Sequence, residues 1–345
     1  MGWIGHLSLE FRHVAHAYGP VRALEEVSFT APAGEITCLL GASGCGKSTL
    51  LGLAAGLLRV QAGAIVLGGE VLADATRSPP PEARPVGLVF QDGALFPHMT
   101  LAQNVAFGLP KERRGEANTW LARVGLGGMG DRYPHELSGG QQQRAALARA
   151  MAPRPQVLLM DEPFASVDIV LRRKLRRECR ILLREAGATV VLVTHDPAEA
   201  LDIGDRIAVM EGGRIVQFGT PQELHEAPAT ASVGAIFGGA QVIRGRRREE
   251  GLDTSFGLWP LASLVGELPD GEALDLLVQA DRLVPVPDMR GCQVRDVHPL
   301  GARARVLLET GEGETITCET ALPVDPDKAY SVIPDPESVR AFVRT

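Results

Sequence analysis

Three glycines precede a Lys-Ser-Thr run in the segment 41–49, Gly-Ala-Ser-Gly-Cys-Gly-Lys-Ser-Thr. The spacing Gly-x4-Gly-Lys-Ser/Thr predicts a loop whose backbone N–H groups surround phosphate groups. Lys47 can then reach the β- and γ-phosphates, and the Ser48 hydroxyl is placed to hold Mg²⁺. The segment therefore predicts a nucleoside triphosphate, without saying what its energy drives; a glycine-rich turn with a surface lysine is the alternative. The residues assigned to this site are Gly41, Ser43, Gly44, Cys45, Gly46, Lys47, Ser48 and Thr49.

Two carboxylates and a histidine follow short apolar runs that are typical of buried parallel strands. Asp161 and Glu162 come directly after residues 157–160, and His195 comes shortly after residues 189–193. Ligands gather at the carboxyl ends of such strands. We therefore expect Asp161 to hold Mg²⁺, Glu162 to orient the attacking water and His195 to reach the γ-phosphate. Solvated turn residues and a structural histidine are the alternatives.

A second glycine-containing helix start lies at residues 137–141, Leu-Ser-Gly-Gly-Gln. Ser138 is a favourable N-cap, and a helix is predicted as far as Ala152 because a proline follows. Gly139 and Gly140 would leave bare backbone N–H groups that can face a phosphate. An ordinary capped helix is the alternative interpretation.

The elements around the phosphate loop follow from the hydrophobic pattern. Residues 3–35 alternate in short stretches, which is typical of antiparallel strands, and residues 36–40 predict a buried strand before the loop. A helical pattern follows at residues 49–57. Tyr18 lies among the first strands, where its ring could stack on an adenine base or simply pack at a strand edge.

The middle of the chain reads as a helical insert. A short buried strand at residues 86–90 ends at Gln91, and residues from about 92 to 150 have a mostly helical pattern with glycine breaks. The mixed apolar stretch 94–109 within it is expected to contact another protein, with burial in the core as the alternative.

The segment 171–184 predicts a helix with one apolar stripe and a basic remainder. The basic residues are interpreted as a solvated face, in preference to a surface for an anionic partner. The stripe consists of Leu171, Leu175, Cys179 and Leu182, and the basic residues are Arg172, Arg173, Lys174, Arg176, Arg177 and Arg180.

The C-terminal third differs from the rest of the chain in its pattern of apolar and polar residues. Residues 219–240 predict a helical connector, and residues 241–345 contain short alternating segments separated by glycine and proline. Such a pattern favours a small β-barrel of the oligonucleotide/oligosaccharide-binding type. We therefore expect a nucleotide-binding domain at residues 1–240 and a second domain at residues 241–345.

Composition excludes several classes of protein. The net charge of −7 argues against a general nucleic-acid binder. The five cysteines show neither metal-ligand spacing nor a disulfide framework, so reduced thiols in a cytosolic protein are expected. No apolar run approaches the roughly 18–20 residues needed to span a bilayer, so a membrane role would come through a partner.

With these pieces placed, residues 7–240 resemble the ATPase subunit of ATP-binding-cassette (ABC) transporters. The stretch Leu-Ser-Gly-Gly-Gln separates this family from most other phosphate-loop ATPases. In the family's order, Tyr18 matches the aromatic that stacks on adenine, residues 41–49 the Walker A loop, Gln91 the Q-loop glutamine, residues 137–141 the signature, Asp161 and Glu162 Walker B, and His195 the switch histidine.

The resemblance implies an α/β phosphate-loop NTPase core with an antiparallel β subdomain and a helical subdomain at about 92–150, followed by the OB-like β-barrel. It implies two copies closing head to tail around two ATP molecules, with Mg²⁺ at each. The implied catalytic residues are Lys47, Gln91, Glu162 and His195. The implied Mg²⁺ ligands are Ser48, Gln91 and Asp161. The signature residues, which would act on the ATP of the other copy, are Ser138, Gly139, Gly140 and Gln141.

The loop after Walker B departs from the family pattern. The family usually reads Ser-Ala-Leu-Asp, whereas residues 165–168 read Ala-Ser-Val-Asp. Asp168 is kept, but the serine hydroxyl that contacts the other copy is replaced by Ala165.

Within the family, the β-rich extension resembles that of bacterial importer subunits, and residues 41–47, 91–98 and 132–144 look most like ferric-iron importers. This resemblance implies two transmembrane permease subunits, docked at residues 94–109, and indirectly a periplasmic substrate-binding protein. It places the chain at the cytoplasmic face of the inner membrane. Importers of polyamines, sulfate, molybdate or sugars are alternatives, and a soluble ABC ATPase in nucleic-acid repair or translation is a remote one. For the C-terminal domain, regulation or dimerisation is favoured over nucleic-acid binding.

Overall fold

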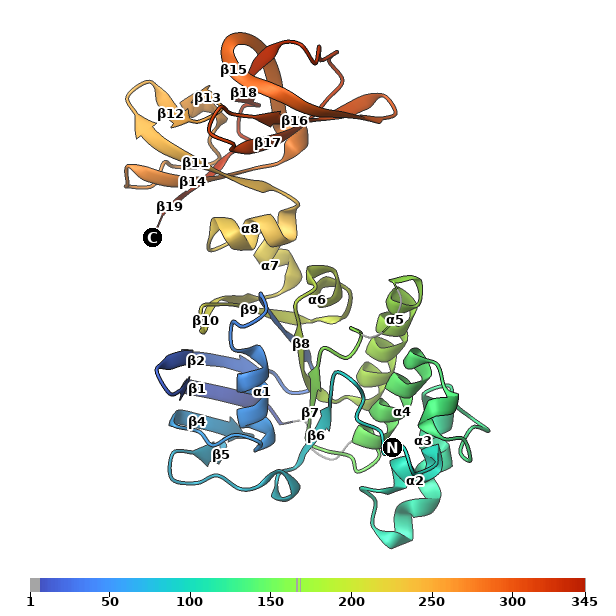
Figure 1. Ribbon diagram of the computed structural model, residues 1–345. Helices are drawn as coiled ribbons and strands as arrows, with labels where there is room; N and C mark the ends of the chain where they lie inside the picture. Colours follow the sequence, from blue (N-terminus) through green and yellow to red (C-terminus); the bar gives the residue numbers. More distant parts are fainter. Residues whose placement is uncertain (1–6, 166, 168, 345) are drawn as a thin grey trace. The chain divides into compact units, whose positions relative to one another are not determined.

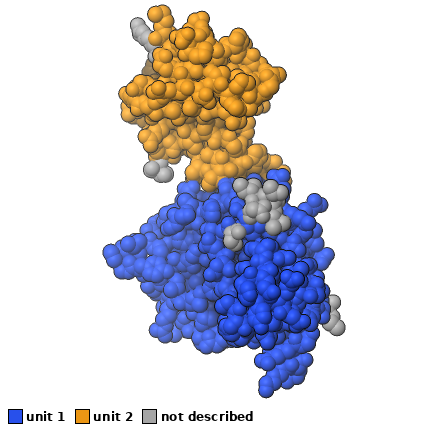
Figure 2. Space-filling model, turned by 45° about the vertical axis from the view of Figure 1, so that its right-hand side comes forward, with its two compact units in different colours: residues 1–221 blue, residues 222–345 orange. Residues whose placement is uncertain are grey.

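The computed structural model describes residues 7–165, 167 and 169–344. Internal contacts divide the chain into two compact units, one up to Pro221 and one from Gln222 onward (Figures 1 and 2). The domain limit expected at residue 240 remains a prediction. Among the described residues, no helix combines the length and the apolar character needed to cross a membrane.

A six-stranded sheet forms the centre of the first unit (Figure 1). Its strand order is β10-β9-β3-β8-β7-β6, and every pair is parallel except β9 with β10. The four inner strands, β9, β3, β8 and β7, are almost wholly buried because helices cover a parallel sheet on both faces. The strands are β3 (Ile36–Leu40), β6 (Val86–Val89), β7 (Val157–Asp161), β8 (Thr189–Thr194), β9 (Arg206–Glu211) and β10 (Arg214–Gly219).

A four-stranded antiparallel sheet of order β2-β1-β4-β5 lies beside this centre. Both sheets share one core with helix α1 (Lys47–Ala55), in which Leu39, Leu53 and Ile65 are fully buried. The expected antiparallel strands ahead of the loop are thus present. They are β1 (Leu9–Tyr18) and β2 (Val21–Ala31), whereas β4 (Ala62–Leu67) and β5 (Glu70–Asp74) come after helix α1.

The part from residue 92 to 151 is mainly helical, as expected. Asn104 is fully buried, and its side-chain amide donates to the carbonyl of Phe96 while its oxygen accepts from the Phe96 N–H. This amide fixes the stretch that precedes α2. The helices of the first unit besides α1 are α2 (Leu101–Ala106), α3 (Ala117–Arg123), α4 (Gly139–Met151), α5 (Ile169–Ala186) and α6 (Pro197–Ile203).

The second unit is mainly β, built on two short helices, α7 (Pro221–Glu226) and α8 (Ala231–Gly238). The α/β class with a C-terminal β unit is confirmed. The described strands of this unit form two sheets, of order β13-β12-β11-β14-β19 and β17-β16-β15-β18, and do not close into one barrel. The strands are β11 (Gln241–Arg248), β12 (Gly251–Thr254), β13 (Gly257–Trp259), β14 (Ala273–Val278), β15 (Leu283–Leu300), β16 (Arg303–Glu309), β17 (Thr315–Thr320), β18 (Ala329–Pro334) and β19 (Arg340–Val343).

Candidate functional site

The strand order brings most of the predicted site residues to one edge of the six-stranded sheet. Strands β3, β8, β7 and β6 are consecutive parallel neighbours, so their carboxyl ends share that edge (Figure 1). The phosphate loop follows β3, His195 follows β8, Asp161 ends β7, and Gln91 comes shortly after β6. In parallel α/β sheets this edge is where ligands bind.

The loop after β3 has a backbone that requires glycine. Gly44 and Gly46 have φ angles of +85° and +106°, in the left-handed region. A Cβ added at Gly46 would lie 2.4 Å from the carbonyl oxygen of Ala23, and one added at Gly41 would lie 2.3 Å from that of Met210. The loop therefore packs backbone against backbone and leads directly into the N-terminus of α1, an arrangement that favours a bound anion.

Lys47 begins α1 and is only 5% exposed. Its Nζ donates to the carbonyl oxygens of Gly41 at 2.8 Å and Ala42 at 2.9 Å. These bonds hold the ammonium group over the loop, where its charge adds to that of the helix N-terminus.

Two of the three residues expected to hold Mg²⁺, Ser48 and Asp161, lie together. The Ser48 hydroxyl donates to Asp161 Oδ1 at 3.3 Å, although the two residues are 113 positions apart. Burial raises the pKa of the Asp161 carboxyl, and nearby Glu162 acts in the same direction, whereas the Ser48 hydrogen bond and the Lys47 charge lower it. A hydroxyl and a carboxylate are the hard oxygen donors that Mg²⁺ takes in phosphate sites, so the donor set fits this ion.

Glu162 and His195 contact each other directly, which was not predicted. The Glu162 Oε1 and His195 Nδ1 atoms are 3.0 Å apart, and the histidine side chain is 54% exposed. Glu162 has φ +42°, and its N–H donates to the Val193 carbonyl at 3.0 Å. A non-glycine residue in this region costs on the order of 1–3 kcal/mol and is found preferentially at functional sites.

Tyr18 ends β1 with half of its side chain exposed. Its hydroxyl oxygen lies 3.4 Å from Thr49 Oγ1, and its ring meets the His16 ring edge to face with centroids 4.9 Å apart. The tyrosine therefore reaches the phosphate loop and stays half exposed, which is compatible with stacking on an adenine base.

The second glycine-containing helix start has the predicted cap and no bond to the first. Helix α4 begins at Gly139 after Ser138, and the Ser138 N–H donates to Gln141 Oε1 at 3.0 Å. Among the hydrogen bonds of the described residues, none joins residues 138–141, or exposed Gln91, to residues 41–49. Asp168, expected in the loop after Walker B, lies outside the described residues.

The interpretation of α5 as carrying a wholly solvated basic face was wrong. Arg176 is 5% exposed, and its guanidinium pairs with Asp196 and lies 3.5 Å from both Glu199 and Asp202. Arg180 pairs with a further carboxylate, Asp205. Solvent exposure does hold for Arg173, Lys174 and Arg177.

This buried cluster borders the histidine of the site. Burial raises the pKa of Glu199 to about 7, against the lowering effects of a 3.0 Å hydrogen bond from Thr194 Oγ1 and of the Arg176 charge. The same Thr194 oxygen accepts the N–H of Asp196. Both neighbours of His195 in sequence are thus fixed by the cluster. Its sequence signal was the complementary spacing of two runs: basic residues at 172, 176, 180 and 184, and acidic residues at 196, 199, 202 and 205.

Comparison with known proteins gives concordant results. A family model described as ABC transporter matches residues 24–165. The chain is 44% identical over 314 residues to the sulfate/thiosulfate import ATP-binding protein CysA 2 of Chromobacterium violaceum, covering 88% of this chain and 84% of that one. It is 49% identical over 239 residues to the Fe(3+) ions import ATP-binding protein FbpC of Rhizobium etli, covering 68% and 67% of the two chains.

Proposed function

The chain belongs to the ABC transporter family, and we propose that it is the ATP-hydrolysing subunit of a bacterial ABC importer. The observation that carries the proposal is the meeting of Ser48 with Asp161 and of Glu162 with His195 at one edge of the parallel sheet. The Ser48 hydroxyl and the Asp161 carboxylate are suited to Mg²⁺. Glu162 is suited to act as a base beside His195, and all four residues lie around the phosphate loop. The importer assignment draws on relatives whose names describe import ATP-binding proteins.

In this proposal catalysis consists mainly of positioning and charge stabilisation. Lys47 and the loop N–H groups bind the phosphates of ATP, and the ring of Tyr18 stacks on adenine. Glu162 accepts a hydrogen bond from the attacking water and polarises it, and His195 donates to the γ-phosphate. Ser48, Asp161 and Gln91 would hold Mg²⁺, which supplies positive charge against the charge developing on the phosphate oxygens.

The 3.0 Å contact between Glu162 and His195 supports these two roles. A carboxylate hydrogen-bonded to the imidazole fixes the ring and its tautomer, which leaves Nε2 for the γ-phosphate. The left-handed backbone of Glu162, with φ +42°, accompanies this contact directly after β7.

We propose further that each ATP is held between two copies of the chain. The phosphate loop of one copy supplies charge on one side of the nucleotide. The N-terminus of α4, with Ser138, Gly139, Gly140 and Gln141, supplies backbone N–H groups from the other copy. Closure with ATP and opening after hydrolysis then form a population switch.

For the transported solute we propose ferric iron, with sulfate or thiosulfate as the alternative. Residues 41–47, 91–98 and 132–144 carry the resemblance to iron importers, and relatives with both kinds of name are similar to this chain. Uptake of radioactive iron and of radioactive sulfate by cells lacking this chain decides between them. Loss of iron uptake alone supports the proposal, and loss of sulfate uptake alone refutes it.

Two permease subunits and an indirectly bound periplasmic substrate-binding protein are the proposed partners, at the cytoplasmic face of the inner membrane. The stretch 94–109 offers a docking surface because Phe107 is 58% exposed there, with its ring against that of Phe96 at a centroid distance of 4.6 Å. The exposed Phe107 ring packs on the half-buried Phe96, whose backbone is held by the buried Asn104 amide, and such a supported aromatic side chain suits a protein contact.

The proposed domain 241–345, which lies within the second unit, is assigned a regulatory or dimerising role. Its large aromatic residues Trp259 and Tyr330 are 0% and 4% exposed. Single-strand binding of nucleic acid needs aromatic faces on which bases can stack. The burial of these rings supports a role other than nucleic-acid binding.

A further inference from the structure

One arginine of helix α4 holds the backbone of the segment 92–96. The Arg149 guanidinium donates to the carbonyl oxygen of Ala94 at 2.6 Å and to that of Gly93 at 2.9 Å. It also lies over the Phe96 ring, 5.5 Å from the ring centroid. The planar fork of a guanidinium suits two neighbouring acceptors, whereas a lysine ammonium is a single point charge. The segment is thus bonded to a helix residue 55 positions away from Ala94 in the chain.

The backbone at this point needs support from its neighbours. Gly93 and Ala94 have φ angles of +70° and +45°, both in the left-handed region. Glycine adopts this conformation freely, but alanine keeps it only where surrounding contacts hold it. Ala94 is exposed, so packing of its side chain contributes little. Its N–H donates to the Asp92 carboxylate at 3.1 Å, and Arg149 holds its carbonyl group from outside the segment.

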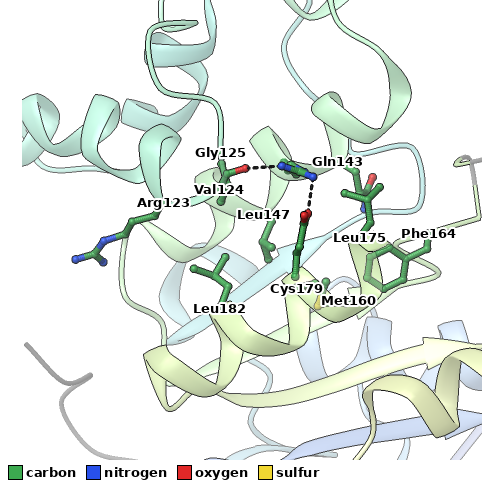
Figure 3. A pocket seen from close by; sticks show the side chains of 12 residues that line it. Arg123, Val124, Gly125, Gln143, Leu147, Met160, Phe164, Leu175, Cys179 and Leu182 are labelled. Atoms are coloured by element: carbon green, nitrogen blue, oxygen red, sulfur yellow. Dashed lines mark hydrogen bonds and ion pairs between the residues drawn. The ribbon is translucent and has the colours of Figure 1, made fainter. Parts of the chain in front are cut away.

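Helix α4 is itself attached to its surroundings. In the wall of the pocket drawn in Figure 3, Arg144 pairs with Glu178 of α5 at 2.5 Å and donates to the Val124 carbonyl at 3.3 Å. Gly93 lies close to the same helix, because a Cβ added to it would come 3.4 Å from the Ala146 Cβ. The bonded segment therefore rests on an anchored helix.

The segment lies between two places that the proposed function uses. Gln91, one of the expected Mg²⁺ ligands, directly precedes it. At its other end, the ring of Phe96 contacts that of Phe107 on the proposed docking surface. The helix that holds it begins at Gly139, in the stretch proposed to face the ATP of the other copy. Arg149 is therefore a direct bonded link between the segment after Gln91 and this helix.

We propose that Arg149 is a positioning residue: it keeps the segment 92–96 in its left-handed conformation and thereby ties the place of Gln91 to helix α4. This role rests on the proposed function and adds one residue to it. Within the described residues, the hydrogen bonds of Arg149 do not reach the phosphate loop. Loss of the arginine should therefore lower kcat for ATP, which needs Gln91 in place, and leave the affinity for ATP unchanged.

Kinetics of the full chain test this division. Arg149→Met removes the donors and keeps an unbranched side chain, so kcat should fall by about tenfold while the Kd of a fluorescent ATP analogue changes by less than about twofold. In an Ala94→Gly background the same substitution should lower kcat by only about threefold, because glycine adopts the left-handed conformation without the arginine. An equal loss of kcat in the two backgrounds would indicate a packing role and overturns the proposal.

Hydrogen exchange tests the same point without ATP. Amide exchange in the peptide 92–97 should become about tenfold faster in Arg149→Met, because the segment opens more often. The matched control is Arg154→Met, at an exposed arginine just after α4, and it should leave the exchange of this peptide unchanged. Exchange at the wild-type rate in Arg149→Met overturns the proposal.

A second variant covers the case in which Arg149→Met does not fold. Ala94→Val leaves the arginine in place but disfavours the left-handed conformation, since a β-branched residue is a genuine outlier there. The position is exposed, so the larger side chain does not enter the core. Ala94→Val should give the same fall in kcat and the same faster exchange, and wild-type values of both overturn the proposal. Absence of ATP hydrolysis by the wild-type chain would refute the proposed function, and the exchange rates then decide on Arg149 separately.

Discussion

Two helix N-termini in the first unit are both suited to anions, and they are built differently. Helix α1 follows a loop with left-handed glycines and carries Lys47, whose ammonium lies over the loop carbonyls. Helix α4 follows Ser138, whose N–H is already bonded to Gln141, and it has no lysine in its first turn. The first can bind an anion by itself, whereas the second is a neutral, self-capped helix start.

Because of this difference, we expect the loop before α1 to determine the affinity for ATP. We expect the start of α4 to contribute only when ATP joins two copies of the chain. A neutral helix start adds on the order of 1 kcal/mol to a phosphate, which is too little for independent binding. The α4 contribution adds to binding when ATP is already held at α1 of one copy and its γ-phosphate faces α4 of another copy.

The largest effect is expected at Glu162, which serves the α1 site. Glu162→Gln removes the base and keeps the shape, so kcat for ATP should fall by about 10²–10⁴-fold while ATP binding persists. Phosphate release and binding of a fluorescent ATP analogue measure the two quantities. Hydrolysis at the wild-type rate in this variant would remove Glu162 from the proposed role.

The next effect concerns the stability of the ion cluster around Arg176, which belongs to neither helix start. Arg176→Met leaves Asp196 and Glu199 without their buried cation, so the free energy of unfolding should fall by about 3 kcal/mol. Arg173→Met, on the exposed face of the same helix, is the matched control and should change it by less than about 0.5 kcal/mol. Urea unfolding measures both. Equal losses would show that the cluster is not a buried ion network.

A smaller effect separates the two helix starts themselves. Lys47→Ala removes one charge-assisted hydrogen bond and should weaken ATP binding to the isolated chain by about 30-fold. Gln141→Ala removes the α4 cap and should change that affinity by less than about twofold. Isothermal titration with ATP and Mg²⁺ gives both numbers. A comparable loss in the two variants would mean that α4 of the same copy contributes to binding.

The smallest effect concerns the backbone of the loop. Gly44→Ala meets no atom within 4 Å and should lower the free energy of unfolding by about 1 kcal/mol, because φ is +85°. Gly46→Ala adds the same strain and a 2.4 Å approach to the Ala23 carbonyl, so its loss should be about twice as large. Chemical denaturation of the two variants compares them. Equal losses would indicate that the loop moves freely away from β2.

Local patterns in the sequence predicted much of the fold and the site. The strand, loop and helix around Lys47 are encoded within twenty residues. The carboxylates and the histidine were expected at strand ends because each follows a short apolar run typical of a buried parallel strand, and β7 and β8 do end at Asp161 and Thr194. Once strands of this kind lie side by side, their carboxyl ends coincide.

Features that depend on packing between distant elements were not predictable. The contact of Glu162 with His195 requires that β7 and β8 be neighbours in a given register, and the left-handed backbone of Glu162 has no residue signature. The burial of Arg176 depends on α6 covering α5. The C-terminal strands were predicted, but their division into two sheets depends on pairing partners far apart, such as β14 with β19.

Cross-linking between copies tests the composite ATP site most directly. Cys45 in the phosphate loop is partly exposed, whereas burial raises the thiol pKa of the other cysteines and leaves them poorly reactive: Cys38, Cys179, Cys292 and Cys318. Ser138→Cys places a second reactive thiol at the start of α4, and Glu162→Gln in the same chain prevents hydrolysis. Equal amounts of ¹⁴N- and ¹⁵N-labelled protein are treated with a short thiol cross-linker. If each ATP is held between two copies, mixed ¹⁴N–¹⁵N links between positions 45 and 138 form, and they form only with ATP; links within single copies alone would contradict a composite site.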